Sequence, residues 1–284
     1  MSIPRIFLIG LLCICTRVAF AATDDGFVGM VLDLQGSGQL VEKGSVTRLQ
    51  LLSYVKPQMQ LKLDAGSKVS LSLYATRSVY QLTGPSVVDI DKDRLTVRQG
   101  AAPVIKSMAE KLVAAAENTN IVHGAYRMRN LAPKIVLTTP ENGSVLLNER
   151  PTFSWEASDV TGYDVTVEEL QEHTIVAIAK VNDTSWQLPA KLKLEYGNNY
   201  RWSVSYPSAK EGKVISAAGD FSLASKADAD KVSALKPEPK AAIEEWILYA
   251  SMLQSQQMRE EARAAWQFVA KRRPDLQKVQ DLAR

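Results

Sequence analysis

The stretches PTFSWEASDVTGYDVTV (residues 151–167) and LEYGNNYRWSVSY (residues 194–206) decide the fold of the middle of this chain. Large apolar residues alternate with polar ones in both stretches, with Phe153 and Trp155 in the first and Tyr200 and Trp202 in the second. A period of two places these aromatic side chains on one face of a strand, where they are buried against a second sheet. The pattern therefore predicts a small antiparallel β-sandwich.

The turns around these stretches divide the region into seven short strands, which we place at residues 135–139, 152–156, 163–170, 174–181, 185–188, 199–206 and 214–223. Seven strands in about ninety residues is typical of an immunoglobulin-like sandwich. The run Leu192, Leu194, Tyr196-Gly197 and Tyr200-x-Trp202-x-Val204 resembles the fibronectin type III signature, and the resemblance covers residues 133–224. It implies that the Tyr200 hydroxyl hydrogen-bonds back to the preceding corner.

The N-terminal segment has the parts of a secretory signal peptide. Arg5 supplies the positive end, residues 6–15 form a ten-residue apolar run, and Ala19-Phe20-Ala21 is an A-x-A cleavage site. Ten residues rise only about 15 Å as a helix, roughly half of the hydrocarbon core. We therefore expect a signal peptide over residues 1–21 and a periplasmic protein. The alternative is a segment that stays in place as an inner-membrane anchor.

Composition excludes several classes of function. The only two cysteines, Cys13 and Cys15, lie in the segment expected to be removed, so disulfides, catalytic thiols and cysteine-based zinc sites are not expected in the mature chain. Loss of Arg5 and Arg17 takes the 34 lysines and arginines to 32, against 31 aspartates and glutamates. A nearly neutral chain without a basic block argues against a nucleic-acid partner.

Residues 24–100 alternate in the same way, with Met59, Leu61 and Leu63 on one face and a turn at Ala65-Gly66. Roughly seven or eight short strands, with frequent turns between them, predict an all-β roll or barrel. The fold class expected for the whole chain is therefore mainly β: this roll and the sandwich, with a connector helix and a C-terminal α-hairpin.

Four features of this first region resemble the FecR family of periplasmic β-domains: the G-x-V opening at Gly29-Met30-Val31, the hairpin at residues 36–44, residues 61–73 with the turn at Ala65-Gly66, and YQLTGPSVVDI at residues 80–90. The resemblance implies a β-domain in the cell envelope. Family members that signal iron uptake carry a transmembrane helix before this domain. A signal-transducing role is thus implied if the N-terminal segment stays as an anchor.

The regions between and after the β-rich parts have other patterns. In residues 101–132, Val104, Met108 and Leu112 recur at helical spacing and predict a connector helix. Residues 225–240 combine charges, alanine and Pro237-x-Pro239, which favours a semi-extended linker.

Residues 241–284 resemble a single tetratricopeptide repeat, a helical hairpin with large, small and terminal residues at fixed positions. The residues that carry the resemblance are Trp246, Ala250, Leu253, Ala262, Trp266 and Pro274. A lone repeat cannot bury its faces by itself, so we expect it to pack on the sandwich, to form homo-oligomers, or to dock on another protein. Trp246 and Trp266 are candidate contact residues for such a partner, and Trp186 is a candidate contact for a protein or a sugar ring.

Charged and catalytic residue types do not gather into a recognisable site. Asp89, Asp91 and Asp93 would share one side of a strand, and we interpret them as a solvated strand edge; the alternative is a weak calcium site. His173 lies among glutamates at a predicted hairpin turn, and His123 has no catalytic companion in its vicinity. We expect no catalytic, cofactor or metal site, and hence no enzyme. The sequence favours an exported, non-enzymatic interaction or scaffold protein of the bacterial cell envelope with a protein partner; the alternative is peptidoglycan or glycan binding.

Overall fold

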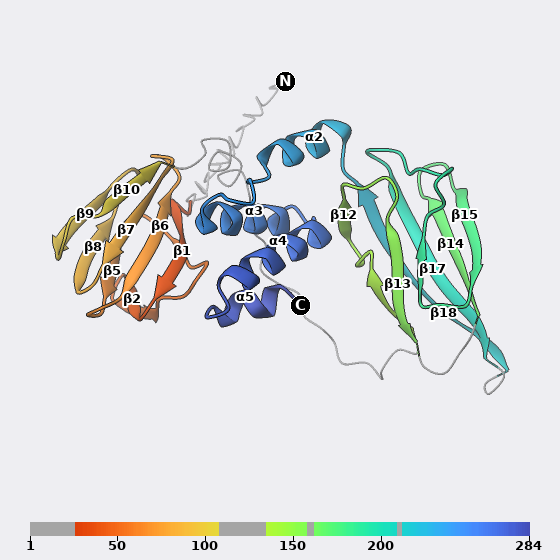
Figure 1. Cartoon of the computed structure of the whole chain (residues 1–284), viewed down its shortest axis with the longest axis horizontal. Coiled ribbons are helices and arrows are strands. Elements are labelled where there is room, and N and C mark those ends of the chain that lie inside the picture. The colour runs from red at the N-terminus through yellow and green to blue at the C-terminus, as the bar shows by residue number, and fades with distance from the viewer. Residues whose placement is uncertain (1–25, 108–134, 158–161, 209–211) are drawn as a thin grey trace, which may run out of the picture.

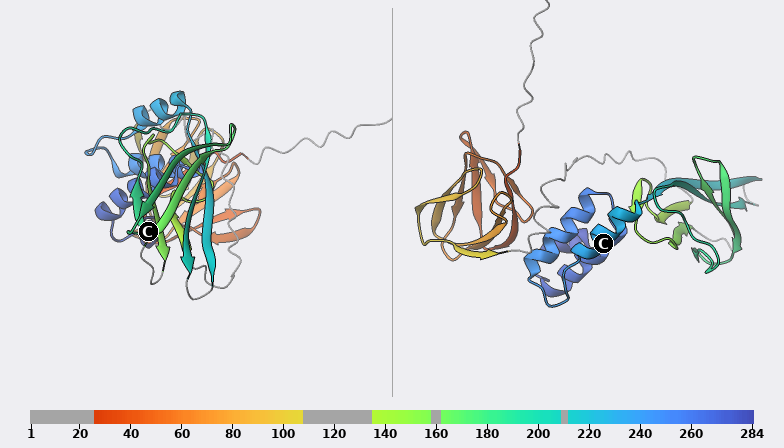
Figure 2. Two further views of the ribbon diagram at one scale, coloured as in Figure 1. Left: turned by 90° about the vertical axis from the view of Figure 1, so that its right-hand side faces the viewer. Right: turned by 90° about the horizontal axis from the view of Figure 1, so that it is seen from above.

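The structure, a computed structural model, describes residues 26–107, 135–157, 162–208 and 212–284. Two β-modules lie at the two ends of the molecule, and a group of helices lies between them (Figure 1). The view from above in Figure 2 shows the same order. The mainly β fold class expected from the sequence is confirmed.

The first β-module consists of two five-stranded antiparallel sheets, with strand orders β10-β7-β6-β1-β4 and β3-β2-β5-β8-β9. Its strands are β1 (Gly29–Gln35), β2 (Gly38–Glu42), β3 (Ser45–Arg48), β4 (Tyr54–Val55), β5 (Met59–Leu63), β6 (Lys68–Leu73), β7 (Ser78–Thr83), β8 (Ser86–Ile90), β9 (Leu95–Gln99) and β10 (Val104–Ser107). Alternating residues such as Leu61, Leu71 and Val88 fill the space between the two sheets. Their period of two is what builds this core.

The second β-module packs a three-stranded sheet, β11-β13-β16, on a five-stranded sheet, β12-β18-β17-β14-β15. Its strands are β11 (Ile135–Thr139), β12 (Ser144–Leu146), β13 (Thr152–Ala157), β14 (Tyr163–Glu169), β15 (Thr174–Val181), β16 (Ser185–Gln187), β17 (Asn199–Ser208) and β18 (Lys213–Leu223). All seven strands expected here are present. The short strand β12, which pairs in parallel with β18, was not expected.

Aromatic side chains form the core of this second module, as the opening stretches predict. Phe153, Trp155 and Trp202 are at most 2% exposed, and the Phe153 and Trp202 ring centroids lie 5.2 Å apart. The Tyr200 hydroxyl accepts a hydrogen bond from the Glu195 backbone amide (2.7 Å) and donates one to the Glu195 carbonyl oxygen (3.3 Å). The corner bond implied by the fibronectin type III resemblance is thus confirmed.

Four helices follow the second β-module: α2 (Lys226–Leu235), α3 (Ile243–Ser255), α4 (Arg259–Arg272) and α5 (Gln277–Leu282). The expected hairpin corresponds to α3 and α4, and α5 adds a third helix to it. We call α2–α5 the helical unit.

Two expectations about the connecting regions were wrong. Val104–Ser107 is not helical but forms strand β10, because its backbone pairs with β7. The predicted linker contains the helix α2, whose N-cap Ser225 accepts a hydrogen bond from the Asp228 amide (3.1 Å). The rest of the predicted connector helix, together with His123, lies outside the described residues.

Candidate functional site: the helical unit and its two joints

The helical unit is built around a large apolar cluster that contains both of its tryptophans. Trp246 is 5% exposed and Trp266 is 1% exposed. The Trp246 ring lies 4.1 Å from the Phe268 ring, and its indole nitrogen donates to the Glu238 carbonyl oxygen at 3.1 Å. The Trp266 indole donates to the Gln254 side-chain oxygen at 3.0 Å. Each indole ring is therefore buried by residues of this chain, and each indole N–H has a hydrogen-bond acceptor within it.

The expected role of Trp246 and Trp266 as contact residues for a partner is corrected by this burial. A partner cannot reach either indole while the helices stay packed. The expectation followed from the spacing of a helical repeat, which identifies large residues without saying what covers them. Here the covering surfaces belong to the same chain.

The first joint connects the helical unit to the outer face of sheet β10-β7-β6-β1-β4. Met30, Leu32, Leu51, Tyr74 and Val79 from the first β-module join the same apolar cluster as the helices. Residues on this face would otherwise meet water.

Small serines on β6 let the helices approach this face closely. Ser70 and Ser72 are 4% and 0% exposed, and the Ser70 hydroxyl donates to the Glu244 carboxylate at 3.2 Å. Alternation of serine with leucine in β6 is typical of a strand with one solvent-exposed face, yet both faces of β6 are buried here.

Two charged side chains near the C-terminus add polar contacts to the first joint. Arg273 donates to the Asp33 carboxylate at 2.5 Å, and both side chains are 15% exposed. The same guanidinium makes two bonds to Asp275, at 2.9 and 2.7 Å, which lower the pKa of the Asp275 carboxyl. Lys278 donates to the Leu51 carbonyl oxygen at 2.9 Å, and burial lowers the pKa of its amine.

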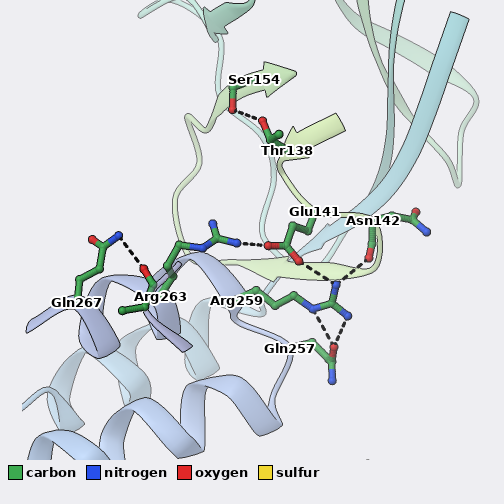
Figure 3. Close-up of polar contacts among 9 residues, drawn as sticks. Thr138, Glu141, Asn142, Ser154, Gln257, Arg259, Arg263 and Gln267 are labelled. Atoms are coloured by element: carbon green, nitrogen blue, oxygen red, sulfur yellow. Dashed lines mark hydrogen bonds and ion pairs between the residues drawn. The ribbon is translucent and has the colours of Figure 1, made fainter. Parts of the chain in front are cut away.

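The second joint connects α4 to the loop before β12. Glu141 lies between the guanidinium groups of Arg259 and Arg263, which bind its two carboxylate oxygens separately (Figure 3). Arg259 also donates to the Asn142 carbonyl oxygen at 3.2 Å and to the Gln257 side-chain oxygen at 2.8 Å. One carboxylate of the second module thereby orients two side chains on the first two turns of α4.

Backbone hydrogen bonds reinforce the second joint. The Val145 amide donates to the Gln257 carbonyl oxygen at 2.9 Å, and the Leu147 amide donates to the Glu261 carboxylate at 3.2 Å. The strand β12 thus pairs with β18, while its middle residue Val145 bonds to Gln257 just before α4 and the following Leu147 bonds to Glu261 in the first turn of α4. Both bonds satisfy main-chain amides, which are obligatory hydrogen-bonding groups.

Two partly buried carboxylates at the start of α4 lie beside this joint. One oxygen of Glu260 and one of Glu261 have no hydrogen-bond partner among the described residues. Burial raises the pKa of the Glu260 carboxyl to about 7; the Glu261 and Glu141 carboxylates also raise it, whereas Arg263 lowers it. Burial likewise raises the pKa of Glu261. The second joint therefore contains a carboxyl group that titrates near neutral pH.

The remaining residues singled out in the sequence do not converge on a site. Trp186 is half-buried, and its ring stacks on Phe153 with centroids 5.5 Å apart. His173 is exposed, and its ring nitrogen lies 3.5 Å from the Glu168 carboxylate. Asp89 binds Gln60 and Arg98 on its own sheet. Asp91 and Asp93 follow the end of β8.

Neither a metal centre nor an enclosed pocket is evident in the described ranges. They contain no group of three or more histidines, cysteines or carboxylates placed to hold a metal ion. An open hollow of about 460 Å³ lies between α4 and α5, with Gln267, Lys271 and Gln280 in its wall. A second hollow, of about 210 Å³, lies beside Tyr200 and contains Glu169, Glu172 and Lys193. Within these ranges no helix has the length and apolarity that a membrane span requires.

The sequence carries part of the signal for the first joint. Met30, Val31 and Leu32 are three consecutive apolar residues, which is the pattern of a strand buried on both faces. In the structure Val31 points into the core of the first β-module, whereas Met30 and Leu32 contact the helical unit. The second joint had no comparable signal, because Glu141 and Arg263 are ordinary surface residue types.

Comparison with known proteins does not assign the chain to a family. No family model and no curated protein matches it. Among solved structures, the β-1,2-glucanase from Parabacteroides distasonis is 10% identical, with a TM-score of 0.21, over 86% of this chain and 49% of that chain. The chain thus spans about half the length of that enzyme. At this TM-score the likeness carries no argument about fold or activity.

Proposed function

We propose that this protein is an exported, non-enzymatic scaffold of the bacterial cell envelope, in which the helical unit holds a FecR-like β-domain and a fibronectin type III-like sandwich in a fixed arrangement. The observation that carries the proposal is that the helical unit packs on both β-modules. It shares one apolar cluster with β1 and its neighbours, and it holds β12 through backbone bonds and the Glu141 ion pairs.

The N-terminal sequence supports the export part of the proposal. Its apolar run of ten residues and its A-x-A site have the features of a signal peptide. A scaffold function also accounts for the ion pairs of Arg259, Arg263 and Arg273, which join the helical unit to the two β-modules. A protein partner of the envelope then docks on the outer surfaces of the β-modules, since the tryptophans of the helical unit are covered.

The proposal is tested by fractionation and site-specific crosslinking in a Gram-negative host. The full chain is expressed with a photo-crosslinking amino acid at Val46 in the first β-module, at Val214 in the second, or at buried Trp246 as a control. We expect a processed periplasmic protein with an N-terminus at Ala22 or Thr23. We also expect an envelope protein crosslinked from a surface position and no intermolecular product from Trp246. Retention in the cytosol, or partner capture equal at all three positions, would contradict the proposal.

A further inference from the structure

The second joint depends mainly on polar contacts, unlike the first. The first β-module contributes five buried side chains to the apolar cluster, whereas the second contributes Ala224 and the partly buried Val145 and Leu147. The ion pair between Glu141 and Arg259 keeps 31% and 38% of the two side chains exposed. The strength of such a contact changes when the charges around it change, which is not true of an apolar contact.

Carboxyl groups outnumber guanidinium groups at this joint. Glu141, Glu260 and Glu261 lie together with Arg259 and Arg263, and Figure 3 shows the two guanidinium groups on either side of Glu141. One oxygen of Glu260 and one of Glu261 are buried without a hydrogen-bond partner among the described residues. With all five groups ionised, three negative charges would face two positive ones. A partly buried charge in that position is unfavourable unless it is paired.

The elements packed against the start of α4 do not balance this excess. The strand β12 has the sequence SVL, without a charged residue. On α3, burial and the Glu261 carboxylate raise the pKa of the Tyr249 phenol to about 12, so this group stays neutral. Glu244 and Glu245 lie at the other end of α3, where Glu244 bonds to Ser70 at the first joint. The helix α5 lies against the second half of α4, around the open hollow described above.

The Glu260 carboxyl is therefore the group whose charge can change within this joint. A helix N-terminus favours carboxylates, which explains why α4 can begin with two of them. At Glu260 burial is the larger effect, and it raises the pKa to about 7. Glu260 thus holds its proton in mildly acidic solution and loses it in mildly alkaline solution.

We propose that the second joint is a proton-sensitive hinge, which is held while Glu260 is neutral and loosens when Glu260 becomes a carboxylate. Glu260 and Arg263 are three residues apart on α4, a spacing at which side chains on a helix are neighbours. An ionised Glu260 therefore competes with Glu141 for the Arg263 guanidinium, and the ion pair across the joint weakens. The hinge rests on the proposed scaffold function, because it regulates the fixed arrangement of the modules.

Loosening of the hinge differs from separation of the modules. The backbone amides of Val145 and Leu147 keep their bonds to Gln257 and Glu261, neither of which needs Arg263. We therefore expect the second β-module to remain attached to the helical unit and to sample a wider range of orientations.

The first test measures distances across the second joint in the purified exported protein. Spin labels on Ile178→Cys and Lys271→Cys span this joint alone, since Ile178 is exposed on β15 and Lys271 is exposed on α4. We expect a narrow distribution of distances at pH 5.5 and one about twice as wide at pH 8.5. The change should have its midpoint near pH 7, where Glu260 titrates. The matched pair Val46→Cys and Lys271→Cys spans only the first joint and should stay narrow at both pH values.

The second test assigns the change to Glu260. Glu260→Gln should keep the distribution narrow at both pH values, because a neutral amide replaces the group that ionises. Glu156→Gln, an exposed position on β13, is the control and should leave the change intact. Glu261→Gln removes a charge that raises the pKa of Glu260, so the midpoint should move to lower pH. A change that persists in Glu260→Gln, or a midpoint that Glu261→Gln leaves in place, would overturn the hinge.

The results distinguish the hinge from the scaffold function. A distribution that is narrow at both pH values in the natural chain would refute the hinge and leave the scaffold intact. A distribution that is already broad at pH 5.5 would refute both, because the arrangement would not be fixed at all. Broadening of the first-joint pair at pH 8.5 would place the effect of pH in the helical unit as a whole and would also contradict a hinge at the second joint.

Discussion

Arg273 is the residue on which the polar part of the first joint depends. Its guanidinium binds Asp33 and Asp275 at once, and little of its side chain is exposed. We expect Arg273→Ala to lower the free energy of unfolding by about 1–3 kcal/mol, because the partly buried Asp33 carboxylate is left without its cation. Urea unfolding at neutral pH measures this loss.

A double-mutant cycle separates this ion pair from general packing. Asp33→Asn combined with Arg273→Ala should cost less than the two single changes together, since the second change removes the uncompensated charge. The exposed Lys271→Ala serves as a control and should change stability by less than about 0.5 kcal/mol. Strict additivity of the two single changes would contradict a direct Arg273–Asp33 interaction.

Glu260 makes the stability of the protein depend on pH. Burial raises the pKa of its carboxyl in the folded protein to about 7, above the ordinary value of 4.5. The folded state therefore binds the proton more tightly than the unfolded state. This group contributes most to stability below pH 4.5, and the contribution is lost as the pH rises through 7.

Glu260→Gln should remove this pH dependence. At pH 8.5 we expect the variant to be more stable than the natural chain by about 1–2 kcal/mol, because a partly buried negative charge is replaced by a neutral amide. At pH 5.5 the difference should shrink. Urea unfolding at the two pH values tests this, with exposed Glu156→Gln as the control. An unchanged difference between the two pH values would refute it.

Among the elements, α2 depends on a single capping residue. Ser225 accepts a hydrogen bond from the Asp228 amide at the start of the helix, and Val232 and Leu235 pack into the apolar cluster. We expect Ser225→Ala to raise amide exchange in α2 through a loss of about 1 kcal/mol of local stability. Ser233→Ala, exposed in the same helix, should leave the exchange rates unchanged or lower them. Equal acceleration by both changes would show that the cap is not the cause.

Signals for α2 were present in the sequence but were outweighed by composition. Ser225 and Asp228 have the spacing of a cap, and Ala229, Val232 and Leu235 recur every three residues. Charged residues and the nearby Pro237 favoured a linker. At Val104 a helix was predicted where the structure has a strand. The helical spacing of apolar residues begins at Val104 and continues into residues outside the described part. Val104 and Ile105, both β-branched, pair with β7. Over the four residues Val104–Ser107, strand pairing overrides the helical pattern.

Strands of the second β-module were predictable because their period was reinforced by aromatic residues. Trp155, Trp202 and Tyr200 alternate with polar residues over long runs, and each run became a strand with one buried face. The packing of the helical unit was not predictable in this way. Alternation in β6 shows that Ser70 and Ser72 share a face, but it does not show which element covers that face, because the contact with Glu244 spans 174 residues of sequence.

On the scale of the whole molecule, the two joints make the helical unit a rigid link rather than a free tail. This is tested by spin labels on Val46→Cys and Val214→Cys, two exposed valines of the two β-modules. Cys13 and Cys15 lie in the segment expected to be removed. We expect one narrow distribution of distances between the labels, because each module is held by several independent contacts.

Glu141→Ala should broaden that distribution, since it removes the carboxylate that binds Arg259 and Arg263 at the second joint. Labels on Val46→Cys and Lys271→Cys span only the first joint and should stay at a narrow distance in the same variant. If the distance distributions of both label pairs broaden, the substitution has disturbed the packing of the helical unit itself and not only the second joint. A broad distribution in the protein with Glu141 intact would show that the modules move independently, and the scaffold proposal would then lose its structural basis.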